Sequence, residues 1–434
     1  MRKSLVVGIL PESKNIWERR APIIPRDVEW LTKRGIQVEV AASKLRIYKD
    51  SQYERSGAKI VSKFNKANLL IGIKEPPIDT LIPNSVYLVF SHTTKGQEYN
   101  RELLSAFVQK RITLIDYEHL TGSLGQRLAY FGRFAGICGM IDTLHVFGKR
   151  QKLHGIPTPF SGLKSAVSYG NYRSAKSALS LAGEQIRKRG FDQRLTPFVI
   201  GVLGHGNVSQ GAQEVLELLG AVTIHPRDLD TLAKSRTSHK KTIYTLVFQR
   251  EEKLRSKKGK NFYFEEYLRH PGLFESNLDT HLPYLNIIIN ASYWDSRYPR
   301  LLPTRMVKNL SRANPDFRLS VIGDLSCDIE GTVQITKRAT TSSDPAYVYD
   351  PVSGKIENDL SHKGIAIMAI DNLPCEFPRE SSTEFSEKIR DFVYQIAAHG
   401  ITDITNHHAL PNSIRNAVVS QNGSLTHKFK YLKK

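Results

Sequence analysis

Short apolar runs alternate with amphipathic segments along the first 120 residues. Helical spacing of apolar residues predicts helices at 25–34 and 96–109. Strands are predicted at the apolar runs 5–10, 37–42, 69–74, 85–90 and 112–117. Strands that alternate with helices are typical of a mostly parallel sheet with both faces covered. The chain is therefore predicted to open with an α/β domain.

A second alternation follows, and it predicts a second domain. The small, apolar stretch 131–148 predicts a buried helix that leaves the first domain, and another helix is predicted at 174–189. Further strands are predicted at 196–203, 221–225, 285–290 and 319–324, with a polar insertion from about 232 to 282. The segment 365–374 leads into a helix at 384–400. If that helix returns to the first domain, the domains are 1–150 with 378–434, and 151–377.

The most informative motif is FVIGVLGHGNVSQG at 198–211, where a predicted strand ends in glycines before a helix. Gly204 and Gly206 can adopt backbone angles closed to other residues, and Gly206 lets a pyrophosphate approach the amides at the helix start. Asn207, Val208 and Ser209 open that helix, with Ser209 in place of the usual third glycine. The motif predicts a dinucleotide site, and a glycine turn that merely ends a strand is the alternative.

The identity of the dinucleotide depends on the strand predicted at 221–225. An NAD-selecting domain usually has an acid at the end of its second strand, but here His225 stands there, followed by Arg227. The missing acid and the nearby cations favour NADPH, whereas Asp228 leaves NADH open. Asn290 and Asp324 end later strands, where they could contact the cofactor or serve structural hydrogen bonds.

Composition narrows the class of protein. A length of 434 residues suggests two domains, and no apolar run reaches the roughly 18 residues of a membrane span. The three cysteines, Cys138, Cys327 and Cys375, lack metal or disulfide spacing, so a reducing compartment is expected. The start of the chain resembles no signal or transit peptide, so a cytoplasmic location is predicted, with mitochondria as the alternative if a targeting segment is missing.

The basic excess suggests anionic partners. The formal net charge is +20, and the basic residues gather in loop-like patches without a recognisable nucleic-acid motif. Such a charge would favour nucleic acid, membrane surfaces or anionic small molecules. A solvated surface is preferred to a nucleic-acid footprint, because the patches carry no such motif.

Motifs along essentially the whole chain resemble one known family. They are WERRAPIIP (17–25), IGIKEPP (71–77), FSHTTKGQE (90–98), LIDYEHL (114–120), GHGNVSQGAQ (204–213), INASYWDSRYPRLLP, IGDLSCDIEG, IDNLPCEFPRE and VVSQNGSLTHKFKYL. The chain resembles lysine-2-oxoglutarate reductase, the N-terminal half of bifunctional aminoadipic semialdehyde synthase, and is similar to fungal saccharopine dehydrogenase. The resemblance implies the alanine dehydrogenase and transhydrogenase architecture: an α/β fold of two Rossmann-like domains with the active site in the cleft between them. Because the chain stops near Lys434, a monofunctional reductase is expected.

Two residues at predicted strand ends are candidates for acid–base chemistry. Lys74 ends the run 69–74, and His92 follows the run 85–90, where parallel strands present residues to a cleft. Burial disfavours a charged lysine, and a histidine titrates near neutrality, so the two could exchange protons. By resemblance they match the family's catalytic lysine and histidine. Without the family, they would be read as an ordinary surface lysine and a strand-end polar residue.

The resemblance also implies supporting roles. Glu75 and Glu118 match acids that tune the proton affinity of the catalytic pair. Arg20 and Arg127 match the substrate-binding arginines, and a guanidinium can grip a carboxylate through two parallel hydrogen bonds. Of the adjacent Arg19 and Arg20, one is expected to point inward. Phe131 would wall the substrate pocket or be a core residue.

The implied reaction condenses the ε-amine of L-lysine with 2-oxoglutarate to an imine, which NADPH reduces to saccharopine without a metal. An NAD-dependent lysine-forming saccharopine dehydrogenase and an alanine dehydrogenase are the enzyme alternatives. A noncatalytic dinucleotide-binding paralogue is the alternative from another class. The expected partners are small molecules, with no specific nucleic acid or membrane, and the sequence does not assign an oligomeric state.

Overall fold

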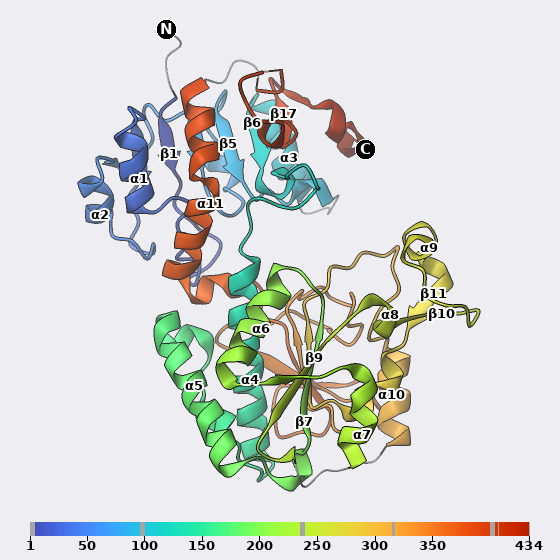
Figure 1. The fold of residues 1–434 in the computed structure, drawn as a ribbon. Coiled ribbons are helices and arrows are strands. Elements are labelled where there is room, and N and C mark those ends of the chain that lie inside the picture. Colours follow the sequence, from blue (N-terminus) through green and yellow to red (C-terminus); the bar gives the residue numbers. More distant parts are fainter. Residues whose placement is uncertain are drawn as a thin grey trace. The chain divides into compact units, whose positions relative to one another are not determined.

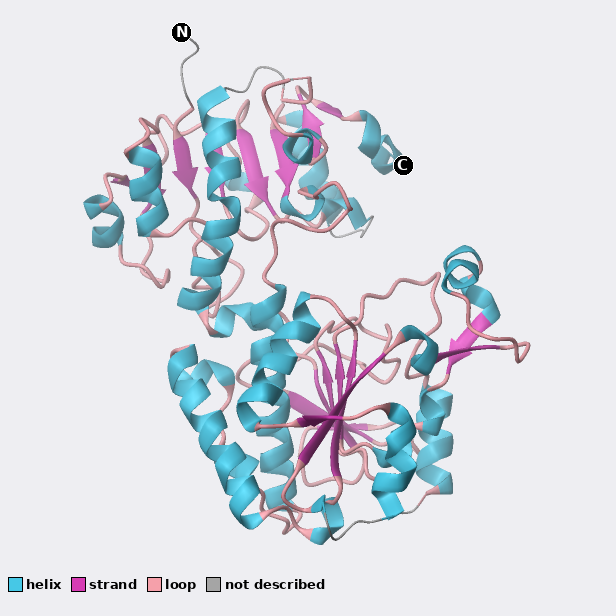
Figure 2. Ribbon diagram, in the orientation of Figure 1, coloured by secondary structure: helices cyan, strands magenta, loops and turns pink. Residues whose placement is uncertain are grey.

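The computed structural model describes residues 5–95, 100–234, 239–314, 317–399, 404–406 and 408–433. The chain divides into two compact units (Figure 1). Unit 1 consists of Met1–Phe131 and Pro378–Lys434, and unit 2 is Gly132–Phe377. Each unit is built around its own sheet with helices on both faces (Figure 2).

The sheet of unit 1 has eight strands in the described part of the chain, in the order β18-β17-β6-β5-β4-β1-β2-β3. Six of them run parallel: β1 (Val7–Ile9), β2 (Val38–Ala41), β3 (Lys59–Val61), β4 (Leu69–Ile71), β5 (Val86–Val89) and β6 (Thr113–Asp116). Their order 3-2-1-4-5-6 is that of a Rossmann sheet. The remaining two, β17 (Val418–Gln421) and β18 (Ser424–Leu425), pair antiparallel at the edge.

Alternate strand residues of this sheet serve two cores. Val7, Ile71 and Leu88 pack with helices α1 (Pro25–Thr32) and α11 (Pro378–His399). Leu70 and Tyr87 face the opposite side and pack with α3 (Arg101–Gln109). Because successive side chains of a strand point to opposite faces, the near-continuous apolar runs of these strands are those of a sheet buried on both sides. A short helix, α2 (Asp50–Arg55), lies between β2 and β3 along the chain.

The main sheet of unit 2 also has eight described strands, in the order β15-β14-β16-β13-β12-β7-β9-β8. Six are parallel: β7 (Phe198–Leu203), β8 (Val222–Thr223), β9 (Ile243–Phe248), β12 (Ile287–Asn290), β13 (Val321–Asp324) and β16 (Ile365–Met368). The strands β14 (Ala346–Tyr349) and β15 (Ile356–Glu357) pair antiparallel at one edge.

Helices cover both faces of this sheet as well. One face packs with α4 (Gly132–Leu153), α5 (Tyr172–Arg189) and α6 (Asn207–Leu219), and the other with α7 (Leu229–Lys234) and α10 (Thr304–Ala313). A separate hairpin of β10 (Leu254–Ser256) and β11 (Phe274–Ser276) stands near α8 (Arg250–Lys253) and α9 (Phe264–Arg269). Among the described helices, none combines the length and the apolar character that a membrane crossing requires.

The α/β class with two Rossmann-like sheets is confirmed, but the structure corrects the expected domain limits. The boundary falls at 131/132 rather than near 150, because the whole of α4 packs against the sheet of unit 2. The sheets are mixed rather than parallel throughout, since the edge strands β14, β15, β17 and β18 are antiparallel. The helix expected at 96–109 is described from Arg101, and residues 96–99 lie outside the described residues.

Two expectations for unit 2 were wrong. The run 221–225 forms only the two-residue edge strand β8, whose residues are exposed, whereas β9 lies beside β7. The segment 232–282 is therefore not one insertion. It contains β9, an internal strand of the sheet between β7 and β8, and only the later hairpin with α9 is an addition to the sheet.

Candidate functional site

Four neighbouring parallel strands of unit 1 end at the same edge of the sheet. The chain continues from β1 to Glu12, from β4 to Lys74 and Glu75, from β5 to His92, and from β6 to Glu118. Residues beyond the carboxyl ends of parallel strands are well placed to meet a ligand. The sheet topology therefore groups the sequence candidates of unit 1, together with Glu12, at one edge.

Lys74 is partly buried among charged groups. Burial lowers the pKa of its ammonium, and the positive charges of Arg20 and Lys14 lower it further, against the opposing charges of Glu18 and Glu75. A lysine whose charged form is disfavoured is more readily neutral, and a neutral amine can accept a proton. Lys74 thus has the electrostatic environment of a general base.

His92 is held by its neighbours in one orientation. Its Nδ1 lies 2.5 Å from Oε1 of Glu75, and its carbonyl oxygen accepts a hydrogen bond of 3.0 Å from Nδ2 of Asn100. The backbone of His92 has φ 50°, a left-handed conformation that is uncommon outside glycine and that clusters at functional sites. Burial raises the pKa of Glu75, but the hydrogen bond and charge of His92, with the charge of Lys74, outweigh it and lower the pKa. Glu75 therefore interacts electrostatically with both candidates.

Glu12 is a member of this group that the sequence interpretation missed. Its carboxylate accepts hydrogen bonds from the backbone amides of Ile73, at 2.6 Å, and Lys74, at 3.0 Å. Burial and the charge of Glu18 raise the pKa of Glu12 to about 7. Glu12 therefore fixes the backbone that carries Lys74 and changes its own charge near neutral pH.

This raised pKa predicts a pH-dependent stability. The folded protein binds a proton at Glu12 that the unfolded chain releases near pH 4.5, so the contribution of Glu12 to stability falls as pH rises toward about 7. Glu12→Gln lacks this fall. Its melting temperature relative to the native protein should rise between about pH 5 and about pH 8. Differential scanning calorimetry tests this, with exposed Glu54→Gln as the control; a pH-independent difference would contradict the pKa of Glu12.

Arg20 is the buried member of the adjacent arginine pair, with 2% of its side chain exposed. Its Nε and Nη2 donate to the two carboxylate oxygens of Glu18, at 2.7 and 2.5 Å. Its guanidinium carbon lies 4.3 Å from the ring centre of Phe131, which stacks at 4.1 Å on Phe385. The structure thus places two of the expected substrate residues, Arg20 and Phe131, in one packed cluster. Two guanidinium donors of Arg20 are already engaged by Glu18.

Arg127 is more accessible, with 49% of its side chain exposed. Its Nη2 lies 3.4 Å from Oε1 of Glu118, a buried acid whose backbone amide donates to Asp116 at 2.8 Å. Burial raises the pKa of Asp116 to about 6 despite a hydrogen bond from Ser91. Of the two candidate arginines, Arg127 is the exposed one, and its contact with Glu118 is longer than that of Arg20 with Glu18.

The glycine turn of unit 2 has room for a ligand. Gly204 has φ +121°, and a Cβ there would lie 2.4 Å from the carbonyl oxygen of Ala291, so both backbone and packing require glycine. A Cβ at Gly206 would meet no atom within 4 Å. Its φ is −83°, so Gly206 does not adopt the special backbone angle expected from the sequence, and neither backbone nor packing requires glycine there. The space at Gly206 would allow a pyrophosphate to approach the start of α6, at Asn207 and Val208.

The substitution of Ser209 for the third glycine has a structural explanation. Ser209 is fully buried and its hydroxyl oxygen lies 3.0 Å from Nε2 of Gln213, one turn further along α6. The close approach of α6 to α4 occurs instead at Gly211, where a Cβ would lie 1.9 Å from the carbonyl oxygen of Arg133. Glycine is thus required two residues later than in the usual fingerprint.

The expected cofactor residues beyond β8 lie apart from β7. His225 Nε2 is 3.1 Å from Oε1 of Glu252, and Arg227 has 80% of its side chain exposed, with Nε 4.0 Å from Asp228. The glycine turn instead contacts β9, because Nε2 of His205 lies 2.9 Å from the carbonyl oxygen of Phe248. The sequence pattern does not single out the residues after β9, since it predicts the run 221–225 as the second strand of the Rossmann sheet.

Asn290 and Asp324 contact each other. Nδ2 of Asn290 donates to Asp324 at 2.8 Å, and the same carboxylate accepts from the hydroxyls of Thr336, at 2.6 Å, and Ser326, at 2.8 Å. Both residues are fully buried, and burial raises the pKa of Asp324. These bonds satisfy the two side chains within the fold and favour a structural role.

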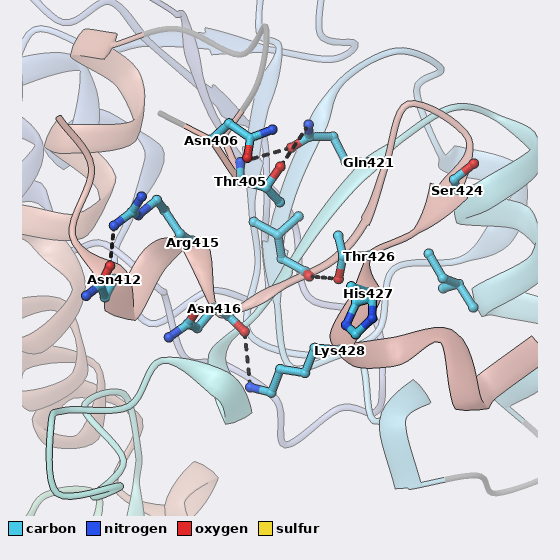
Figure 3. Close-up of a pocket in the computed structure, with 12 residues that line it drawn as sticks. Thr405, Asn406, Asn412, Arg415, Asn416, Gln421, Ser424, Thr426, His427 and Lys428 are labelled. Carbon is cyan, nitrogen blue, oxygen red and sulfur yellow. Dashed lines mark hydrogen bonds between the residues drawn. The ribbon is translucent and has the colours of Figure 1, made fainter. Parts of the chain in front are cut away.

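A surface pocket of unit 1 lies elsewhere. It is lined by residues of 405–428, including Arg415 of α12 (Asn412–Arg415), Gln421 and Lys428 (Figure 3). Lys428 donates to the carbonyl oxygen of Asn416 at 3.2 Å. None of the sequence candidates lines this pocket. Among the described residues, no group of three or more His, Cys, Asp or Glu side chains is arranged to hold a metal ion.

Comparison with protein families gives two matches that cover most of the chain. The family model described as "Alanine dehydrogenase/PNT, N-terminal domain" matches residues 8–138, and "Alanine dehydrogenase/PNT, C-terminal domain" matches 190–428. Two solved structures share the fold. An L-alanine dehydrogenase covers 99% of both chains with TM-score 0.59 and 18% identity, and the transhydrogenase from Sinorhizobium meliloti covers 97% of this chain and 99% of its own with TM-score 0.52 and 15% identity.

Curated relatives extend the comparison. Alpha-aminoadipic semialdehyde synthase of Arabidopsis thaliana is 33% identical over 98% of this chain and 41% of its own length. The mitochondrial enzyme of the same name from Mus musculus is 32% identical over 99% and 48%. This chain thus spans less than half the length of either relative. Saccharopine dehydrogenase [NAD(+), L-lysine-forming] of Neurospora crassa is 27% identical over 88% of this chain and 89% of its own.

These relatives confirm the resemblance drawn from the sequence motifs. The matches extend through both units, from the strand ends of unit 1 to the glycine turn of unit 2. The chain belongs to the alanine dehydrogenase/PNT family.

Proposed function

We propose that this chain condenses L-lysine with 2-oxoglutarate and reduces the resulting imine to saccharopine with NADPH. The observation that carries the proposal is the electrostatic grouping of Lys74, Glu75 and His92 at adjacent strand ends. The names of the relatives, aminoadipic semialdehyde synthase and saccharopine dehydrogenase, point to the same chemistry. The roles of all site residues below are part of this proposal.

The reaction requires proton transfers that these residues can perform. The ε-amine of lysine attacks the ketone carbon, and the carbinolamine then loses water to give an imine. A hydride and a proton convert the imine into a secondary amine. Neutral Lys74 accepts the proton released by the attacking amine, and His92, oriented by Glu75, exchanges a proton with the carbinolamine oxygen. Burial around Lys74 limits the water that would hydrolyse the imine.

The turn from Gly204 to Ser209 would hold the pyrophosphate of the dinucleotide. A bound nicotinamide supplies the hydride. The open space at Gly206 is the observation that supports binding there, independently of the acid–base group. We propose NADPH as the preferred form, and the NAD-dependent, lysine-forming enzyme is the alternative that the Neurospora crassa relative's name suggests.

Arg127 is proposed to bind a carboxylate of 2-oxoglutarate. Arg127→Lys keeps the charge but cannot form two parallel hydrogen bonds to a carboxylate. The KM for 2-oxoglutarate should therefore rise about tenfold, which corresponds to the free energy of one lost charged hydrogen bond. The KM for lysine should change much less. Steady-state kinetics with each substrate varied in turn tests this, with exposed Arg101→Lys as the matched control. Unchanged 2-oxoglutarate kinetics would reject the assignment.

A substrate-omission assay tests the function as a whole. Purified protein should oxidise NADPH only when lysine and 2-oxoglutarate are both present, and NADH more slowly. Oxidation with pyruvate and ammonia instead would identify an alanine dehydrogenase. A folded protein that binds nucleotide but oxidises neither form under any condition would support the noncatalytic alternative.

A further inference from the structure

The strand order of unit 2 indicates which residues would contact the adenosine ribose of a bound dinucleotide. In a Rossmann sheet of order 3-2-1-4-5-6, the residue that distinguishes a 2′-hydroxyl from a 2′-phosphate follows strand 2, which neighbours the glycine-turn strand on the side away from strand 4. In unit 2, β12 lies on the strand-4 side of β7. Strand 2 is therefore β9, which pairs with β7 along its whole length, from Phe198↔Ile243 to Leu203↔Phe248. The contact of His205 with the carbonyl oxygen of Phe248 joins the glycine turn to the end of β9. The chain runs from β9 directly into α8 (Figure 1). By this rule, the residues directly after Phe248 would stand at the discriminating position.

Arg250 is the second residue after β9, and its side chain is exposed. Its guanidinium carbon lies 4.0 Å from the ring centre of Phe264 in α9. Stacking on a ring engages the face of a guanidinium and leaves its in-plane N–H donors available for an anion. Among the described residues, Arg250 forms no ion pair within 4.0 Å that would occupy those donors.

The neighbouring charged groups are arranged differently. The carboxylate of Glu252 already accepts from the backbone amide of Gln249, at 2.6 Å, and lies 3.1 Å from His225 Nε2. Arg227 follows the edge strand β8, on the far side of β9 from β7, and faces Asp228. Glu251 is exposed and follows Arg250 in the chain. If this position selected NADH, Glu251 would be the acid that accepts a hydrogen bond from the ribose 2′-hydroxyl.

We propose that Arg250 binds the 2′-phosphate of the adenosine half of NADPH, and that Arg227 does not. This assignment rests on the NADPH preference in the proposed function. It moves cofactor selection from the end of β8, where the sequence pattern put it, to the end of β9. The site belongs to unit 2 alone, so it can be tested without turnover.

The test measures binding of 2′,5′-ADP and 5′-AMP to the full-length protein by isothermal titration calorimetry. These two probes differ only in the 2′-phosphate. The native protein should bind 2′,5′-ADP more tightly. Arg250→Ala should weaken 2′,5′-ADP by about 10- to 100-fold and leave 5′-AMP unchanged, because charged hydrogen bonds to the phosphate are lost. Arg227→Ala, the matched control, should change neither, and circular dichroism confirms that both variants are folded.

Each other outcome overturns a different statement. If the native protein prefers 2′,5′-ADP but Arg250→Ala keeps that preference, the assignment of Arg250 fails while the proposed NADPH preference stands. A loss of the preference in Arg227→Ala would return selection to the end of β8. Equal binding of the two probes by the native protein, with Glu251→Gln weakening 5′-AMP, would overturn both the NADPH preference and the role of Arg250.

Discussion

Lys74→Met combined with His92→Gln should lower turnover by roughly 10²- to 10⁴-fold, the usual contribution of general acid–base catalysis. Both substitutions remove a group that can exchange protons and keep a side chain of similar size. The affinity for NADPH should stay the same, because the glycine turn belongs to unit 2 and these residues to unit 1. Single-turnover absorbance at saturating substrates measures the effect on chemistry, and calorimetric titration measures nucleotide binding.

The control for this variant is Lys63→Met, which removes an exposed lysine of the same unit. It should have the turnover of the native protein. Near-native turnover in the double variant would exclude Lys74 and His92 from the chemistry. A parallel loss of turnover and nucleotide binding would instead indicate a folding defect.

Arg20→Met should lower the free energy of unfolding by about 3–5 kcal/mol, because it leaves the buried carboxylate of Glu18 without its guanidinium partner. The cation–π contact with Phe131 is lost as well. Urea unfolding followed by circular dichroism measures the change. Glu18→Leu combined with Arg20→Met should recover most of the stability, since replacing both members of a buried pair by apolar groups is often nearly neutral.

This pair of variants separates stability from substrate binding. A double variant as unstable as Arg20→Met would show that the ion pair does not account for the loss. If the double variant is stable but its KM for 2-oxoglutarate is raised, Arg20 also contributes to binding the substrate, as the family resemblance implies. Native stability in Arg20→Met would contradict the buried ion pair itself.

The edge of the sheet that carries the candidate site could be predicted from the sequence. Uninterrupted apolar runs in alternation with helices predict parallel strands, and parallel strands present their ends at one edge. This rule predicts the positions of Lys74 and His92, and the structure puts them after the neighbouring strands β4 and β5. Glu118, which only the family resemblance indicated, follows the next strand, β6. The glycine turn could also be predicted, because its strand, turn and helix follow one another directly in the sequence.

What the sequence could not supply depends on contacts between distant segments. The chain crosses over so that β9, and not β8, lies beside β7. No local pattern in the sequence distinguishes an edge strand from its neighbour when both runs are apolar. The raised pKa of Glu12 arises from burial and the charge of Glu18. Its carboxylate is held by the backbone amides of Ile73 and Lys74, which are distant in the sequence. The engagement of Arg20 by Glu18 also depends on burial, since an i, i+2 pair in an exposed loop would be weak.

The central claim is that this chain forms a carbon–nitrogen bond between lysine and 2-oxoglutarate. Lysine labelled with ¹⁵N at the ε position, 2-oxoglutarate and NADPH should be incubated with the purified protein and the products analysed by mass spectrometry. We expect saccharopine that retains the ¹⁵N label, formed in equal amount to the NADPH oxidised and almost absent with Lys74→Met/His92→Gln. NADPH oxidation without labelled saccharopine, or unlabelled glutamate as the product, would contradict the proposed reaction.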